Sequence, residues 1–128
     1  MDLSIGVTEP RQSTVVDLTH AESMTGNWRW QASLTYVSAN HYHPIRQNAQ
    51  WALQGLVLRG AGPLEFGAGF ALLDHRDWWN GSRLNVCLQA SYHLPRRPLT
   101  ISWRHWSNAG LAEPNWGTDM LLIGWTFH

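Results

Sequence analysis

Apolar and polar residues alternate along most of this chain, and turn-forming residues interrupt the alternation at short intervals. A period of two is typical of β-strands, whose successive side chains point to opposite faces, and no segment has a convincing helical period. The clearest run is 84–94, where Leu, Val, Leu, Ala, Tyr and Leu alternate with Asn, Cys, Gln, Ser and His. Similar runs cover 3–7, 16–19, 28–36, 51–58, 64–73, 99–104 and 121–127. The pattern predicts an all-β fold of about eight strands, the smallest size of an outer-membrane barrel.

The connectors between these runs fall into two sets of different length. The long ones are 38–49, 74–82 and 108–118. Those at the opposite end of the predicted sheet are the tight turns 59–63 and 94–98 and the intermediate stretch 21–26. One-sided loop length is typical of antiparallel barrels with short periplasmic turns and longer outer loops. The connector at 9–12 is the exception, because it is short on the long-loop side.

Alternation alone does not say which face is inside, because a soluble ligand-carrying barrel has the same period with the faces exchanged. One face carries charged residues among small and polar ones, namely Asp17, Arg29, Glu65, Arg83 and Arg104. That face suits a narrow lumen in which charges can pair. The other face is apolar and has Trp at both ends: Trp28, Trp30 and Trp125 near the short turns, and Trp51, Trp78, Trp79 and Trp106 at or near the long loops. Two aromatic bands are typical of membrane interfaces, so the sequence favours an eight-stranded antiparallel transmembrane (outer-membrane) β-barrel over a soluble, lipocalin-like barrel that binds an apolar ligand.

Composition narrows the classes of function. A chain of 128 residues suffices for one domain, which we expect to be 1–128. Nine basic side chains, all Arg, balance nine acidic ones, so no basic tract indicates a nucleic-acid partner. No segment reaches the roughly 20 apolar residues that a spanning helix needs. The single cysteine, Cys87, cannot form an internal disulfide and matches no zinc spacing. No leader precedes Asp2, so we expect either a cytosolic chain or a mature one whose signal peptide has been removed.

The stretch RHWSNAGLAEPNWGTD, residues 104–119, carries the candidate chemistry. Residues two apart in a strand share a face, so His105 and Ser107 are predicted neighbours with the outward parity of the apolar residues before them. Asp119 has the same outward parity on the strand that a hairpin places beside them. Ser107 as nucleophile, His105 as base and Asp119 as the acid that orients it would form a triad, with Asn108 or a nearby backbone N–H as oxyanion donor. The alternative is an ordinary polar strand end with a turn.

HWSNAGLAEPNWGTD resembles the C-terminal signature of the lipid A 3-O-deacylase family, PagL. The shared features are a histidine, a serine two residues later within SNAGL, a PN pair, and a Gly before an acidic residue. The resemblance implies an eight-stranded barrel in the outer membrane of a Gram-negative bacterium, with Ser107 as nucleophile, His105 as base, Asp119 as the acidic member and Asn108 in the oxyanion hole. It implies lipid A or lipopolysaccharide and the membrane as partners, and no cofactor or metal.

Three features depart from the family pattern. The acidic position is typically Glu, and Asp119 is one methylene shorter. The terminal aromatic, Phe127, is followed by His128, and the first outer connector is very short. With these departures, we expect a serine esterase that releases a 3-hydroxy fatty acid from position 3 of lipid A; the rival readings are a non-catalytic membrane barrel and the soluble barrel. The sequence does not determine the oligomeric state, and a homodimer is the assembly to test.

Two weaker predictions concern the long loops. Cationic side chains in these loops could contact lipid A phosphates. They are His41, His43, Arg46, His75 and Arg76. The favoured interpretation is that they are ordinary solvated loop residues. No recognised ligand spacing among the histidines indicates a metal. Trp106 has lumen parity beside the candidate pair, and we expect it to pack beneath the site.

Overall fold

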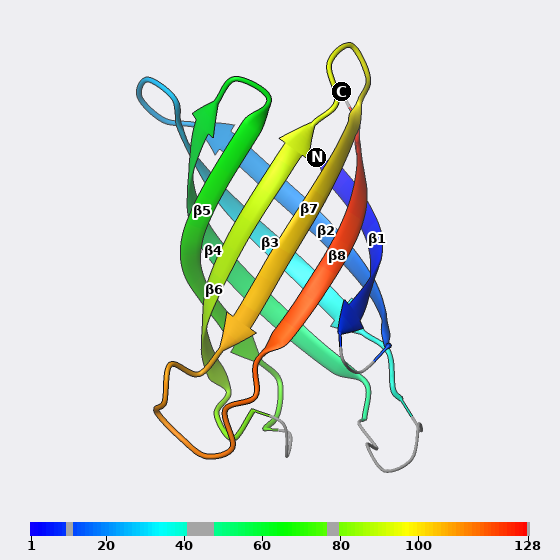
Figure 1. The fold of residues 1–128 in the computed structure, drawn as a ribbon, viewed down its shortest axis with the longest axis vertical. Helices are drawn as coiled ribbons and strands as arrows, with labels where there is room; N and C mark the ends of the chain where they lie inside the picture. Colours follow the sequence, from blue (N-terminus) through cyan, green and yellow to red (C-terminus); the bar gives the residue numbers. More distant parts are fainter. Residues whose placement is uncertain (10–11, 41–47, 77–79, 128) are drawn as a thin grey trace.

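The chain forms a closed barrel of eight antiparallel strands (Figure 1), seen in a computed structural model that describes residues 1–9, 12–40, 48–76 and 80–127. The strands are β1 (Asp2–Glu9), β2 (Thr14–Ser23), β3 (Trp28–Val37), β4 (Gln50–Ala61), β5 (Leu64–Leu73), β6 (Leu84–His93), β7 (Leu99–Ser107) and β8 (Thr118–Thr126). Each strand pairs with the next, and β1 pairs with β8 to close the barrel. Closure leaves no strand edge unpaired, which confirms the all-β barrel predicted from the alternation.

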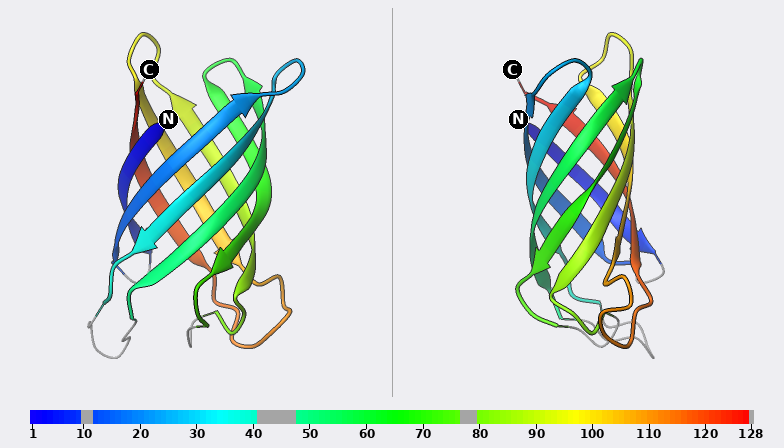
Figure 2. Two further views of the ribbon diagram at one scale, coloured as in Figure 1. Left: turned by 180° about the vertical axis from the view of Figure 1, so that it is seen from behind. Right: turned by 90° about the vertical axis from the view of Figure 1, so that its left-hand side faces the viewer.

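The two ends of the barrel differ as the connector lengths predicted. Figures 1 and 2 show the tight turns and both ends of the described chain at one end of the barrel, and the described parts of the longer connections at the other. The short first connector also lies at the long-loop end, where Thr8 N donates to Ser13 O at 2.9 Å and Gln12 N donates to Thr8 O at 2.8 Å. Among the described residues, no helix is long and apolar enough to cross a membrane.

The barrel is apolar outside and largely polar inside. Large exposed hydrophobic side chains occur on every strand, for example Ile5, Leu18, Leu34, Leu53, Phe70, Leu88, Ile101 and Ile123. Buried polar side chains face the lumen, among them Asp17, Gln31, Gln54, Gln89 and Arg104. An apolar exterior is stable against lipid and not against water, so this distribution is that of a membrane barrel.

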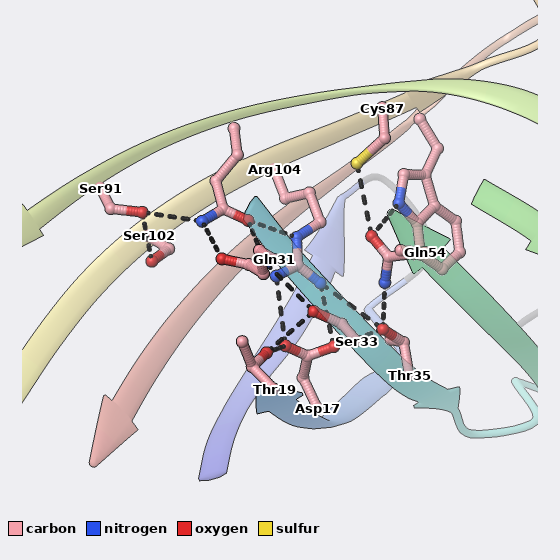
Figure 3. Close-up of polar contacts among 12 residues, drawn as sticks. Asp17, Thr19, Gln31, Ser33, Thr35, Gln54, Cys87, Ser91, Ser102 and Arg104 are labelled. Atoms are coloured by element: carbon pink, nitrogen blue, oxygen red, sulfur yellow. Dashed lines mark hydrogen bonds and ion pairs between the residues drawn. The ribbon is translucent and has the colours of Figure 1, made fainter. Parts of the chain in front are cut away.

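A hydrogen-bonded ion pair lies inside the lumen (Figure 3). The Arg104 guanidinium, 2% exposed, donates to both Asp17 carboxylate oxygens at 2.9 and 3.1 Å. Its Nε donates to Gln89 Oε1 at 3.0 Å, and Asp17 also accepts from the hydroxyls of Thr19 and Thr35. Pairing and extra hydrogen bonds offset the desolvation of both charges.

The lumen is filled by these side chains. Among the described residues, the cavity between these side chains has a volume of about 30 Å³. Pockets that hold small molecules typically have volumes of about 300–1,000 Å³. The interior is therefore too small for the apolar cargo of a lipocalin-like barrel, and the soluble reading is wrong.

Strand lengths differ from the alternating runs in two ways. The runs 16–19 and 51–58 are parts of longer strands, β2 and β4, because backbone pairing continues where the side-chain alternation fades. Leu94 continues the alternation after β6 but lies in the turn, where its N–H donates to Leu99 O at 2.9 Å.

Candidate active site

The candidate site lies on the outer surface of β7 and β8, at the long-loop end of the barrel. Strand pairing puts His105 directly opposite Asp119 on β8 and opposite Leu88 on β6. Ser107 ends β7 opposite Val86. All three polar residues are on the face that the parity predicted, and they are partly exposed between buried neighbours. The polar site is therefore bordered by lipid-facing apolar side chains.

His105 and Asp119 are joined by a hydrogen bond. His105 Nδ1 lies 3.1 Å from Asp119 Oδ1, with side-chain exposures of 28% and 48%. Directly opposed residues in an antiparallel pair have Cβ atoms only about 4.5–5.5 Å apart, so the short Asp side chain spans the distance. The missing methylene therefore does not prevent contact. With Nδ1 engaged by the carboxylate, Nε2 is the ring nitrogen left to act as a base.

Gly117 provides space beside that second nitrogen. Its φ is +72°, and a Cβ added there would lie 2.7 Å from His105 Cε1, 3.3 Å from Nε2 and 3.2 Å from the carbonyl oxygen of Trp106. Gly117 precedes Thr118, which pairs with Trp106, so it lies on the Ser107 side of His105. The absence of a side chain lets the loop backbone pass close to the imidazole without a clash. Sequence reasoning had used this glycine only as part of a family signature.

Ser107 shares the face of His105 but is not bonded to it. Within the described part of the chain, no hydrogen bond joins Ser107 Oγ to the imidazole. Catalytic hydrogen bonds are often long or misaligned without substrate and tighten in the substrate complex. The structure thus brings two of the three predicted members together and leaves the serine adjacent to them.

Asn108 is buried and is bonded to the loop that follows it. Its Nδ2 donates to Ala112 O at 2.7 Å and to Pro114 O at 3.2 Å, while its Oδ1 accepts from Gly110 N at 3.0 Å. Its backbone N–H donates to Asn115 Oδ1 at 2.9 Å. These bonds fix the loop between β7 and β8. The oxyanion role predicted for Asn108 stays a prediction.

Trp103 is a site residue that sequence reasoning did not single out. Its Nε1 donates to Asp119 Oδ1 at 3.0 Å, the same oxygen that His105 approaches. Its ring stacks on the imidazole with centroids 6.0 Å apart and an interplanar angle of 19°. The available signal was its position two residues before His105, on the same face of the strand.

The residues on either side of His105 point into the barrel. Trp106 is 1% exposed and donates from Nε1 to Gln54 Oε1 at 3.1 Å, which confirms that it packs beneath the site. Its placement in the outer aromatic band was wrong, because its strand position turns the ring into the lumen. Arg104 is held by Asp17. His105 therefore sits on a strand fixed from inside by two large side chains.

The loop cations predicted to contact phosphates are only partly described. His41, His43 and Arg46 lie outside the described residues, as do Trp78 and Trp79 of the predicted outer aromatic band. His75 Nδ1 lies 2.7 Å from Asp74 Oδ1, and Arg76 is exposed. Phosphate contacts stay a prediction. Among the described residues, no group of three His, Cys, Asp or Glu side chains could hold a metal ion.

Comparisons with known proteins agree on one family. The family model described as lipid A 3-O-deacylase (PagL) matches residues 14–128. The crystal structure of the outer membrane enzyme PagL is similar in fold, with a TM-score of 0.66, 16% sequence identity and 98% of each chain covered. No curated protein sequence matches the chain.

Proposed function

The chain belongs to the lipid A 3-O-deacylase (PagL) family, and from this premise we propose that Ser107, His105 and Asp119 are the triad of its ester hydrolysis. The barrel is an outer-membrane enzyme, and its substrate is the 3-O-linked acyl ester of lipid A. The hydrogen bond from His105 Nδ1 to Asp119 Oδ1, at 3.1 Å, is the observation that carries the assignment of roles.

The first half of the reaction forms an acyl-enzyme. Ser107 Oγ attacks the ester carbonyl while His105 Nε2 takes its proton, and the Asp119 carboxylate stabilises the resulting imidazolium. The tetrahedral intermediate then collapses, and the imidazolium protonates the sugar oxygen that leaves. In the second half, water attacks the acyl-serine while the same nitrogen takes its proton, and the imidazolium then returns that proton to Ser107 Oγ as it leaves. The products are a 3-hydroxy fatty acid and lipid A with a free hydroxyl at position 3.

The location of the site supports a lipid substrate. The three side chains face outward among Leu88, Val86 and other lipid-facing residues. A lipid in the same leaflet can reach such a site laterally, with its acyl chains along the apolar barrel wall. Polar groups on a lipid-facing surface are costly unless they pair and have a function.

The proposed site also needs a donor for the oxyanion. We assign it to Asn108, as the family resemblance implies. Its Nδ2 bonds to two loop carbonyls, and the bond to Pro114 is the longer at 3.2 Å. Release of that bond would free one hydrogen for the oxyanion. The homodimer remains a separate prediction.

The test is mass spectrometry of lipid A after incubation with detergent-folded protein. We expect wild type to remove one hydroxyacyl chain and Ser107→Ala to remove none. Ser102→Ala is a matched control on the same strand, because Ser102 Oγ is bonded to Ser91 Oγ at 2.9 Å, away from the site. Deacylation by Ser107→Ala would show that Ser107 is not the nucleophile. A folded wild-type barrel without hydrolysis would favour the non-catalytic barrel.

A further inference from the structure

Trp103 presents a polar N–H on the lipid-facing side of the barrel. It is 43% exposed and lies in the middle of β7, paired with Leu121 on β8 and Ala90 on β6. The Trp residues of membrane barrels usually lie at the interfaces, where water can bond the indole N–H. Trp103 is placed deeper than the strand end at Ser107. An N–H in this position needs a partner from the protein.

The partner that it has is the acid of the proposed triad. Trp103 Nε1 donates to Asp119 Oδ1 at 3.0 Å, and His105 Nδ1 lies 3.1 Å from the same oxygen. The indole and imidazole rings are nearly parallel, at 19°, with centroids 6.0 Å apart. Each of the three side chains therefore contacts the other two.

A second carboxylate near Asp119 explains why the hydrogen bond from Trp103 matters. On the other side of Asp119, strand pairing places Glu9 of β1, exposed and on the same outward face. A like charge in the directly opposed position repels the Asp119 carboxylate. The donors on β7 hold Asp119 on the side where it orients His105. The indole ring also covers one face of the imidazole, where a π surface favours the imidazolium that forms during catalysis.

We propose that Trp103 is a positioning residue of the active site, which fixes the Asp119 carboxylate and the His105 ring together. It transfers no proton and contacts no reacting atom. This inference rests on the proposed triad and deepens it. It also explains how an Asp serves where the family pattern has the longer Glu, because Trp103 supplies a second hydrogen bond that restricts the short side chain.

The experiment uses the detergent-folded barrel and two readouts. One is kcat and KM for lipid A deacylation. The other is the rate at which a fluorophosphonate probe labels Ser107, which reports on activation of the serine without lipid A binding. Trp103→Phe keeps an aromatic ring and removes the N–H. Trp125→Phe is the matched control, a lipid-facing Trp of similar exposure near the other end of β8. Strand circular dichroism and thermal unfolding check that each variant is folded.

We expect Trp103→Phe to lower both kcat and the labelling rate about tenfold, as for loss of one hydrogen bond to a charged group, with KM unchanged. Trp125→Phe should match wild type. In an Asp119→Ala background, Trp103→Phe should have no further effect, because the carboxylate through which it acts is gone.

Several outcomes would overturn the inference. These are wild-type labelling and kcat in Trp103→Phe, a change confined to KM, or an equal loss with and without Asp119. If the Asp119→Ala protein labels too slowly to measure, the test rests on the kcat and KM of Trp103→Phe in the otherwise wild-type protein. Failure of the triad itself looks different, since the folded wild type would then neither hydrolyse lipid A nor label at Ser107.

Discussion

Gly117→Ala offers the sharpest test of the geometry around His105. The added Cβ would lie 2.7 Å from His105 Cε1 and 3.2 Å from the Trp106 carbonyl oxygen. Carbon atoms in contact prefer about 3.5–4.0 Å, so the imidazole must move by about 0.8 Å or more. The backbone carbonyl cannot yield as easily. The movement falls on the ring that accepts the proton from Ser107 in the proposed mechanism.

The size of the effect follows from this displacement. Misplacement of a catalytic group by about 1 Å can cost about 10²-fold in rate. Gly117 also has φ +72°, and the left-handed conformation costs a non-glycine residue about 1–2 kcal/mol of stability. Gly110→Ala separates the two effects, because Gly110 lies in the same loop at φ +79° with no heavy atom within 4 Å of an added Cβ. Both variants should lose similar stability, and only Gly117→Ala should lose about a hundredfold in kcat.

The assay pairs initial rates of lipid A deacylation with thermal unfolding of the same preparations. The comparison of the two variants removes the contribution of backbone strain. A Gly117→Ala enzyme within a few fold of Gly110→Ala in kcat would show that the His105 ring can move without loss of rate. The base assigned to His105 Nε2 would then be wrong.

Three further predictions concern the acid, the lumen and the loop. Asp119→Asn should lower kcat by about 10²–10⁴-fold, because a neutral amide does not stabilise the imidazolium. Asp119→Glu should keep at least about a tenth of the activity. Lipid A mass spectrometry measures both variants. Asp17→Ala should cost about 3–5 kcal/mol in urea unfolding, because it leaves the buried Arg104 guanidinium unpaired. Asn108→Ala should lower both the melting temperature and kcat, since the loop loses the three hydrogen bonds of the carboxamide. Unchanged activity would exclude Asn108 from the oxyanion hole.

Much of the fold could be predicted because a barrel repeats one simple rule. Period-two alternation gave the number of strands, and connector lengths gave the two ends. The choice of face needed a second signal, the Trp residues near the strand ends. Strand bounds were less accessible: β4 continues to Ala61 although the apolar alternation stops at 58, because pairing with β5 depends on the backbone of both strands.

The site could be predicted only where neighbours in the sequence or across one hairpin define it. Parity and the β7–β8 hairpin were enough to place His105 and Asp119 on one face. The partners of Asn108 depend on how the loop folds, so a carboxamide expected at the substrate is found bonded to loop carbonyls. Trp103 was counted as one more apolar residue, because the pattern does not record where an indole N–H points.

Side chains on the inner face of β7 anchor the strand, and those on its outer face form the site. Because the two kinds alternate, each site residue lies between anchored neighbours. Arg104 and Trp106 point inward and are held by Asp17 and Gln54, so the backbone on both sides of His105 is fixed from the lumen. The outward side chains can then remain exposed to lipid and still keep their orientation, because a strand anchored on one face limits movement on the other. A site on a loop would lack this support. The polar side chains that fill the lumen therefore support the lipid-facing site from inside the barrel.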